Sequence, residues 1–115
     1  MSGVYDDKDE GMEVSAVTSS LKKFYEGKIV TALVGIKTDV NRVDQVAKNL
    51  SGNKGVEDIF IVTGDFDIII KVRFPEFWNL QEFLVEELSK LPGVKESKTM
   101  MVLSTIKDMG RTFGR

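Results

Sequence analysis

The chain has 115 residues, of which 42% are hydrophobic and 30% charged, and its formal net charge is −2. This length supports one domain with one modest core, and the charge gives no basic excess for nucleic-acid binding. Neither Cys nor His occurs, which excludes thiol nucleophiles, imidazole bases and nearly all zinc or copper sites. Catalysis would therefore depend on carboxylates, Lys, Ser, Thr or Tyr.

The first 27 residues are predicted to form a tail and one amphipathic helix. Residues 1–11 are acidic and lack the basic start and apolar core of a signal peptide. A helix is expected over 12–26, because apolar residues recur at helical spacing, and Gly27 ends it. These residues are Val14, Val17, Leu21, Phe24 and Tyr25. No apolar run reaches the ~20 residues that span a bilayer, so we expect no membrane contact and a cytoplasmic location.

The first strand and the next helix are predicted from 28 to 50. The segment KIVTALVGIK, 28–37, is rich in β-branched residues and fits a strand buried on both faces. In the helix that follows, either Asp39 or Asn41 can cap the start. Its expected apolar face contains Val40, Val43, Val46, Ala47 and Leu50.

The second half is predicted to repeat this order. Two strands are expected over 55–73, joined at Gly64-Asp65 by a two-residue hairpin turn. Pro75 is expected to begin a helix, where its missing N–H does no harm, and Pro92-Gly93 to end it. The apolar stripe of this helix contains Phe77, Leu80, Phe83, Leu84, Leu88 and Leu91. A last strand is predicted from Val94 to about Ile106, before a polar tail.

These elements predict an α+β domain of the ferredoxin-like βαββαβ type. A four-stranded antiparallel sheet would carry two helices on one face, with the short N-terminal helix in addition. The expected boundaries are 1–27 for the tail and helix, 28–108 for the domain and 109–115 for a C-terminal tail. Ile59, Ile61 and Ile69 are expected on the uncovered sheet face. A large exposed apolar face favours a partner, and we expect a homodimer that packs sheet against sheet.

The stretch TGDFD, residues 63–67, is the main candidate for a functional site. Asp65 and Asp67 are expected to point to the same side, because side chains alternate along a strand. Paired carboxylates serve acid–base catalysis when their surroundings differ strongly, and an exposed turn offers little difference. Two interpretations stay open: a turn in which Gly64 supplies a positive φ, or a site whose backbone N–H groups and carboxylates bind a zwitterionic amino acid.

Other candidate residues have simpler explanations. Lys71 and Arg73 are expected to form a solvated edge or interface ion pairs rather than a phosphate site. Phe60, Phe66 and Phe74 could suggest stacking of RNA bases on a sheet, but DFDIIIKV lacks the Lys/Arg-Gly-Phe type of motif that such sheets carry. Packing is therefore the expected role of the aromatic residues.

Two segments resemble the effector-binding half of the leucine-responsive and asparagine-regulator (Lrp/AsnC) family of transcription factors. They are VTGDFDIIIKVRF and LQEFLVEELSKLPGVKESKTMMVLSTIK. The resemblance covers about 28–108, and its most specific parts are the TGDFD hairpin, Leu91-Pro92-Gly93-Val94, and Thr99 before Val102-Leu103. It implies dimers through facing sheets, rings of dimers, and small effectors, usually amino acids. The ligand-binding residues that it implies are Thr63, Gly64, Asp65, Phe66, Asp67, Thr99, Ser104 and Thr105.

The family resemblance also leads us to expect neither direct DNA binding nor enzymatic activity. Residues 1–27 are too few for the helix-turn-helix of the full-length regulators, so no direct DNA binding is expected. The resulting hypothesis is a stand-alone, non-enzymatic, self-associating sensor without a cofactor, able to co-assemble with full-length family regulators. The alternatives are a small dimeric α+β-barrel enzyme, such as a cofactor-free monooxygenase or isomerase, and an oligomerisation domain with an empty pocket. The missing His counts against the enzyme.

Overall fold

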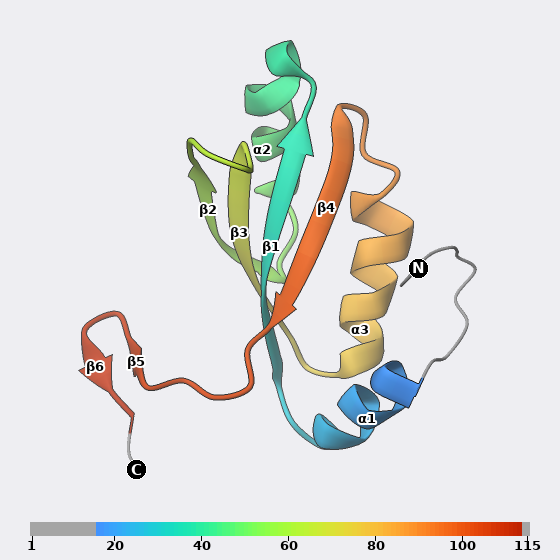
Figure 1. The fold of residues 1–115 in the computed structure, drawn as a ribbon, viewed down its shortest axis with the longest axis vertical. Coiled ribbons are helices and arrows are strands. Elements are labelled where there is room, and N and C mark those ends of the chain that lie inside the picture. Colours follow the sequence, from blue (N-terminus) through green and yellow to red (C-terminus); the bar gives the residue numbers. More distant parts are fainter. Residues whose placement is uncertain (1–15, 114–115) are drawn as a thin grey trace.

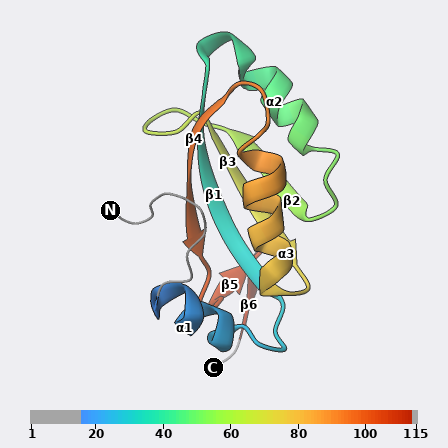
Figure 2. The ribbon, with the colours of Figure 1, turned by 90° about the vertical axis from the view of Figure 1, so that its right-hand side faces the viewer.

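The computed structural model describes residues 16–113 and shows a four-stranded antiparallel sheet of order β2-β3-β1-β4 (Figure 1). Both long helices pack on one face of this sheet, and the other face is open (Figure 2). The predicted ferredoxin-like arrangement is confirmed. The strands are β1 (Val30–Thr38), β2 (Val56–Ile61), β3 (Ile68–Phe74) and β4 (Val94–Met101), and the helices are α1 (Ala16–Phe24), α2 (Val43–Leu50) and α3 (Phe77–Glu82).

The core lies between the sheet and the helices. Alternate residues of β1 are buried, from Val30 to Ile36, and their partners Ile70 and Val72 on β3 are buried beside them. Helix α3 continues as a π-helical turn, η2 (Phe83–Leu88). The helices contribute Val46, Leu50, Leu80, Phe83 and Leu88 to the core. Both predicted apolar stripes therefore face the sheet, with the exception of Val40, which is 95% exposed in the 3-10 turn η1 (Val40–Arg42).

Several local expectations are wrong, and each has a structural reason. Neither Asp39 nor Asn41 caps α2 with its side chain, because η1 intervenes and Arg42 takes the N-cap position. Pro75 lies before Glu76, the N-cap of α3, and so outside the helix. Strand β1 is buried on one face rather than both, since Leu33 and Lys37 are exposed on the other. The part of the predicted first helix before Ala16 lies outside the described residues.

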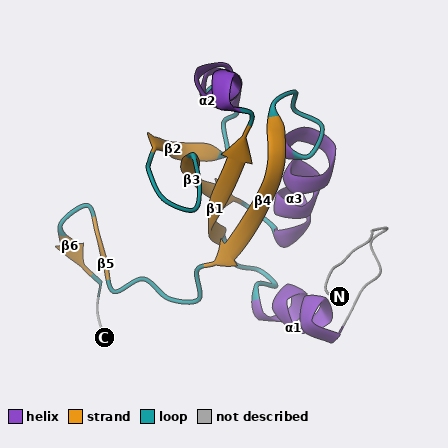
Figure 3. Ribbon diagram, turned by 45° about the horizontal axis from the view of Figure 1, so that its top comes forward, coloured by secondary structure: helices purple, strands orange, loops and turns teal. Residues whose placement is uncertain are grey.

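The connection from β2 to β3 is longer than the two-residue turn predicted. It runs from Val62 to Asp67, and the Val62 N–H donates to the Asp67 carbonyl at 2.9 Å. Gly64 has a φ of 116°, so the positive φ expected there is present. The last strand ends at Met101 instead of near Ile106. A separate hairpin of β5 (Lys107–Asp108) and β6 (Arg111–Thr112) follows, apart from the main sheet (Figure 3).

The open face of the sheet carries different residues from those predicted. Ile59 and Ile61 pair with Ile70 and Ile68, whose side chains are buried under the helices, so both isoleucines face the helix side. The β2 residue that shares the open face with Ile69 is Phe60. A register shift between Val56 and Asp58 moves the alternation by one position. Only Ile69 of the three predicted isoleucines therefore lies on the open face.

Candidate functional site

The hairpin of residues 62–67 folds back over the open face of the sheet. Its Asp67 N–H donates to the Ile36 carbonyl at 2.9 Å, and the Thr38 N–H donates to Asp67 Oδ2 at 2.9 Å. Asp67 therefore joins this hairpin to β1 through both its main chain and its carboxylate. A carboxylate held by a backbone N–H has a structural role that needs no ligand.

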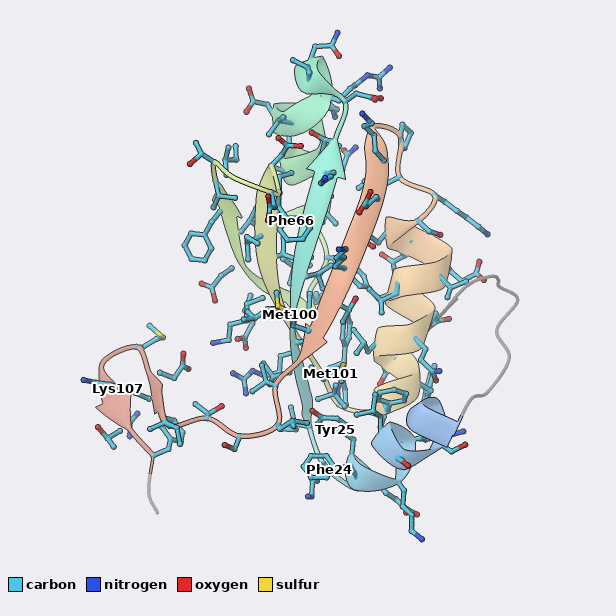
Figure 4. The ribbon with its side chains drawn as sticks, viewed as in Figure 1. Phe24, Tyr25, Phe66, Met100, Met101 and Lys107 are labelled. Carbon is cyan, nitrogen blue, oxygen red and sulfur yellow. The ribbon has the colours of Figure 1, made fainter. Side chains whose placement is uncertain are left out.

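The Phe66 ring packs against β1 at Gly35, a position that has no side chain. A Cβ added at Gly35 would come within 2.7 Å of the Phe66 ring, closer than carbon atoms can approach without displacement. The ring therefore covers Gly35 on the open face, as Figure 4 shows for Phe66 beside β1. The packing of the Phe66 ring on Gly35 fixes the direction in which the hairpin leaves the sheet.

A cavity of about 290 Å³ lies beside this hairpin on the open face. Its lining contains two acids, two lysines and two apolar side chains: Asp65, Glu96, Lys37, Lys98, Phe66 and Met100. A volume near 300 Å³ is at the lower end of the range for small-molecule sites. The mixture of both charges with an apolar wall matches a small zwitterion with an apolar side chain.

The structure separates the residues that the resemblance implied as ligand-binding. Asp65 and Phe66 line the cavity beside the hairpin, whereas Thr63 and Gly64 are exposed in the hairpin without lining it. Thr99 pairs with Val34 and so faces the helix side of β4. The placement of Thr99 follows from the alternation of side chains along paired strands.

Ser104 and Thr105 line a different cavity of about 470 Å³, together with Thr31, Leu33 and Phe113. The two cavities lie toward opposite ends of β1. Val102 hydrogen bonds to Thr31, and Asp67 to Ile36, five positions or roughly 16 Å along the strand at about 3.3 Å a residue. Ser104 and Thr105 therefore do not join Asp65 in one site within a single chain.

Four cavity residues, Lys37, Glu96, Lys98 and Met100, were absent from the sequence-based site. The pattern that could have indicated them is the alternation of side chains along β4, which puts Glu96, Lys98 and Met100 on one face. In the sheet these three residues pair with Lys37, Gly35 and Leu33 of β1. The sequence alone does not show this, because it requires the register between β1 and β4. Among residues 16–113, acidic residues form no group of three that could hold a metal ion.

A second charged cluster lies on the open face around Lys71. Its Nζ is 3.0 Å from Asp108 Oδ1 and 3.6 Å from Glu57 Oε1, and Arg73 Nε is 2.7 Å from Glu57 Oε2. The hydrogen bond that Lys71 Nζ donates to Asp108, assisted by the charges of Asp108 and Glu57, raises the pKa of Lys71 above its ordinary value. Lys71 and Arg73 are thus engaged in ion pairs within the chain.

The fold and the mixed-charge cavity define an α+β ligand-binding domain, and comparison with known proteins gives its family. Residues 31–112 match the model of the Lrp/AsnC ligand binding domain. The chain belongs to this family. In the described part of the chain, no helix is long and apolar enough to cross a membrane.

Individual relatives agree with this assignment. An uncharacterised HTH-type transcriptional regulator of Pyrococcus furiosus is 30% identical over 90 residues, which cover 78% of this chain and 60% of the relative. A hypothetical protein from Pyrococcus horikoshii has a similar structure, with a TM-score of 0.62 and 26% identity, covering 66% of this chain and 92% of that one. The curated relatives are named transcriptional regulators, which does not favour the enzyme alternative.

A third likeness concerns the fold alone. A transcriptional regulator from Neisseria meningitidis, solved as a complex with L-Met, has a TM-score of 0.66 at 17% identity, and the match covers 91% of this chain and 65% of that one. The chain spans about 60% or less of the first curated relatives that it matches.

Proposed function

We propose that this chain is a non-enzymatic amino-acid-sensing module that self-associates and modulates transcription. The observation that carries the proposal is the 290 Å³ cavity at the hairpin, where lysines, carboxylates and apolar side chains converge. Lys37 and Lys98 suit the α-carboxylate of an amino acid, and Asp65 and Glu96 suit its ammonium group. The regulator from Neisseria meningitidis, with the same fold, was solved with L-Met, which supports an amino acid as the class of ligand.

The apolar wall favours amino acids with an apolar side chain. Phe66 and Met100 form this wall, and a flexible thioether beside an aromatic ring adapts to several shapes. The cavity opens on the sheet face that a second copy would cover. Ligand binding and assembly are then linked, because a ligand stabilises whichever assembly presents the complete pocket.

The ligand is tested by measuring thermal stability with each of the twenty amino acids, since a ligand at 100 times its dissociation constant adds about 2.7 kcal/mol to the free energy of unfolding. The best amino acid is then compared by calorimetry with its amide and with its deaminated acid. Both analogues should bind at least tenfold more weakly, because each removes one charge. Equal binding of all three would exclude recognition of a zwitterion.

The site is tested by the variants Asp65→Ala and Lys98→Gln. Each should keep the fold and weaken binding about tenfold, which corresponds to about 1.4 kcal/mol. Asp44→Ala and Lys48→Gln on α2 are matched controls, because both side chains are exposed and lie outside the cavity. If Asp65→Ala and Lys98→Gln bind as tightly as the controls, the hairpin is only a turn and the ligand site lies elsewhere.

Self-association is tested at Ile69, which is half-buried on the open face. Ile69→Asp should dissociate a dimer, because burial of an unpaired carboxylate is unfavourable, and Ile69→Thr should do so less. Sedimentation equilibrium at micromolar concentration measures the effect. A folded monomer for the unaltered chain would contradict the sheet-to-sheet dimer, and with it the proposed rings of dimers and co-assembly with longer family members.

A further inference from the structure

The chain does not end at the sheet but continues into a projecting C-terminal arm, residues 103–113. The Val102 N–H makes the last hydrogen bond to β1, at the Thr31 carbonyl (3.0 Å), before the chain leaves the sheet. Figures 1 and 3 both show β5 and β6 apart from the four-stranded sheet. The expected polar tail is therefore replaced by a structural element with no neighbour on its outer side in the described chain.

The arm is a formed hairpin rather than a loose end. Met109 and Gly110 have φ values of 50° and 80°, and two consecutive positive φ values define the turn that matches the twist of paired strands. Lys107 pairs with Thr112 across the hairpin, and the Phe113 N–H donates to the Ile106 carbonyl at 2.7 Å.

The apolar side chains of this hairpin face solvent. Their exposed fractions are 64% for Leu103, 70% for Ile106, 92% for Met109 and 49% for Phe113. A two-stranded hairpin with no core of its own is marginal in water. A partner that covers these side chains would stabilise the arm, because the described residues 16–102 leave them exposed.

The turn end of the hairpin is ion-paired with the chain's own sheet. Asp108 Oδ1 is 3.0 Å from Lys71 Nζ, and the side chain of Lys71 is only 18% exposed. Between the arm and the sheet lies the cavity of about 470 Å³ that includes Leu33 and Phe113. The arm is thus anchored by one ion pair and separated from its own open face by a space with apolar residues on both sides.

The geometry points to a second copy of this chain as the occupant: we infer that the arm of each copy packs over the open sheet face of the other. This inference rests on the proposed self-association and identifies the element that clamps it. Phe113 of the arm and Leu33 of the open face line the same cavity, and the apolar side chains of Phe60 and Ile69 lie farther along that face. In a two-fold dimer both arms make the same contact, so it closes without exposing a new surface.

The charges on the arm and on β2, and the range of the family match, agree with a second copy of the chain as the partner. Lys107 and Arg111 are exposed cations on the arm, and Asp58 is an exposed acid beside Phe60 on β2. An arm that lies on β2 of the other copy places opposite charges together around an apolar centre. The match to the family model extends to residue 112, so it includes nearly all of the arm.

The first test removes residues 103–115 and measures the dimer dissociation constant by sedimentation equilibrium. The shortened chain should dimerise at least tenfold more weakly. Val40→Ser is the matched control, because Val40 is equally exposed but lies in η1, and it should leave the constant unchanged. If the shortened chain fails to fold, Ile106→Ser/Phe113→Ser keeps the backbone and should weaken the dimer in the same way.

The second test places a photo-crosslinker on a cysteine introduced by Met109→Cys, which is the only cysteine because the natural chain has none. Equal amounts of unlabelled and ¹⁵N-labelled protein are mixed, so that only links between copies contain one light and one heavy peptide. Mixed links should map to the open faces of β2 and β3. Links within one copy only, or links to the helices, would overturn the inference.

The outcomes separate this inference from the proposed function. A dimer that is unaffected by arm removal, with dissociation constants equal within twofold, overturns the clamp and leaves the sheet-to-sheet dimer intact. An unaltered chain that stays monomeric overturns both. Loss of the dimer on arm removal with unchanged amino-acid affinity supports the clamp and places the ligand site within one copy.

Discussion

Single residues in this structure often have roles that their chemical type alone does not reveal. Asp65 and Asp67 are two positions apart, yet Asp67 accepts the Thr38 N–H while Asp65 lines a cavity. One carboxylate is thus a tether and the other a candidate ligand contact. Tyr25 and Thr38 show the same dependence on surroundings, and each supports a test.

Tyr25 connects the N-terminal helix to the end of β4. Its hydroxyl donates to the Val102 carbonyl, and its ring stacks on Phe77 with centroids 6.1 Å apart. Tyr25→Phe should lower the free energy of unfolding by about 1–2 kcal/mol, because a buried carbonyl loses its donor. Urea denaturation at pH 7 measures this, and Tyr25→Leu should have a larger effect, since it also removes the stacked ring.

The same residue gives stability a pH dependence. Burial raises the pKa of the Tyr25 hydroxyl above 10.0, so the folded state favours the neutral phenol. Its contribution is complete below pH 10 and is lost as the pH rises through the folded-state value. The unfolding free energy should fall above pH 10, with a smaller fall in Tyr25→Phe. Identical alkaline profiles for the two proteins would contradict this linkage.

Thr38 has a hydroxyl for which the described residues offer no hydrogen-bond partner, although the atom is buried. Thr38→Val keeps the shape and the N–H bond to Asp67 while removing the unpaired oxygen. We expect the unfolding free energy to rise by about 1 kcal/mol, because an unsatisfied buried hydroxyl is unfavourable. Thr38→Ser, which keeps the hydroxyl, should not stabilise the protein when both variants are compared by urea denaturation.

At the scale of elements, the hairpin before β3 depends on the strand beneath it. Phe66 lies over Gly35, and Asp67 bonds to Ile36 and Thr38, which follow Gly35 in the same strand. Strand β1 therefore determines the conformation of the candidate site, although most of the site residues belong to other elements. The energy of this contact can be measured at Gly35.

Gly35→Ala should displace the Phe66 ring, since the new Cβ would lie 2.7 Å from it. We expect a loss of about 1–3 kcal/mol in unfolding free energy and faster hydrogen exchange at the amides of Asp67 and Thr38. Gly52→Ala is the control, because its new Cβ would meet only an ordinary contact at 3.7 Å. Unchanged exchange at both amides in Gly35→Ala would show that the hairpin does not depend on this contact.

At the scale of the whole molecule, one sheet face is covered by helices and the other is open. The open face carries the candidate ligand cavity, the Lys71 ion pairs and the anchor of the arm. The features on which the proposed function and assembly rest therefore lie on the same face of the sheet. The formal net charge of −2 gives the chain no excess of basic residues.

The purified 115-residue chain should not bind specifically to its own upstream DNA at physiological salt. Sequence-specific binding requires several phosphate contacts from basic residues and an element that enters a groove, and a single helix precedes β1 in the described part of the chain. Gel-shift titration with and without a longer family member measures this. A specific complex at nanomolar concentrations of the chain alone would contradict the expectation.

The sequence alone determined the order of the main helices and strands and the ferredoxin-like class, because apolar periodicity and turn residues are local signals. The resemblance of residues 28–108 to the Lrp/AsnC family indicated the family. Tertiary structure decided which side chains meet. The register shift in β2 exchanged Ile59 and Ile61 for Phe60 on the open face, and pairing with β1 placed Lys98 and Met100 beside Asp65. It also separated Ser104 and Thr105 from the hairpin and lifted the arm off the sheet. These features depend on contacts between residues far apart in the chain, which periodicity does not encode.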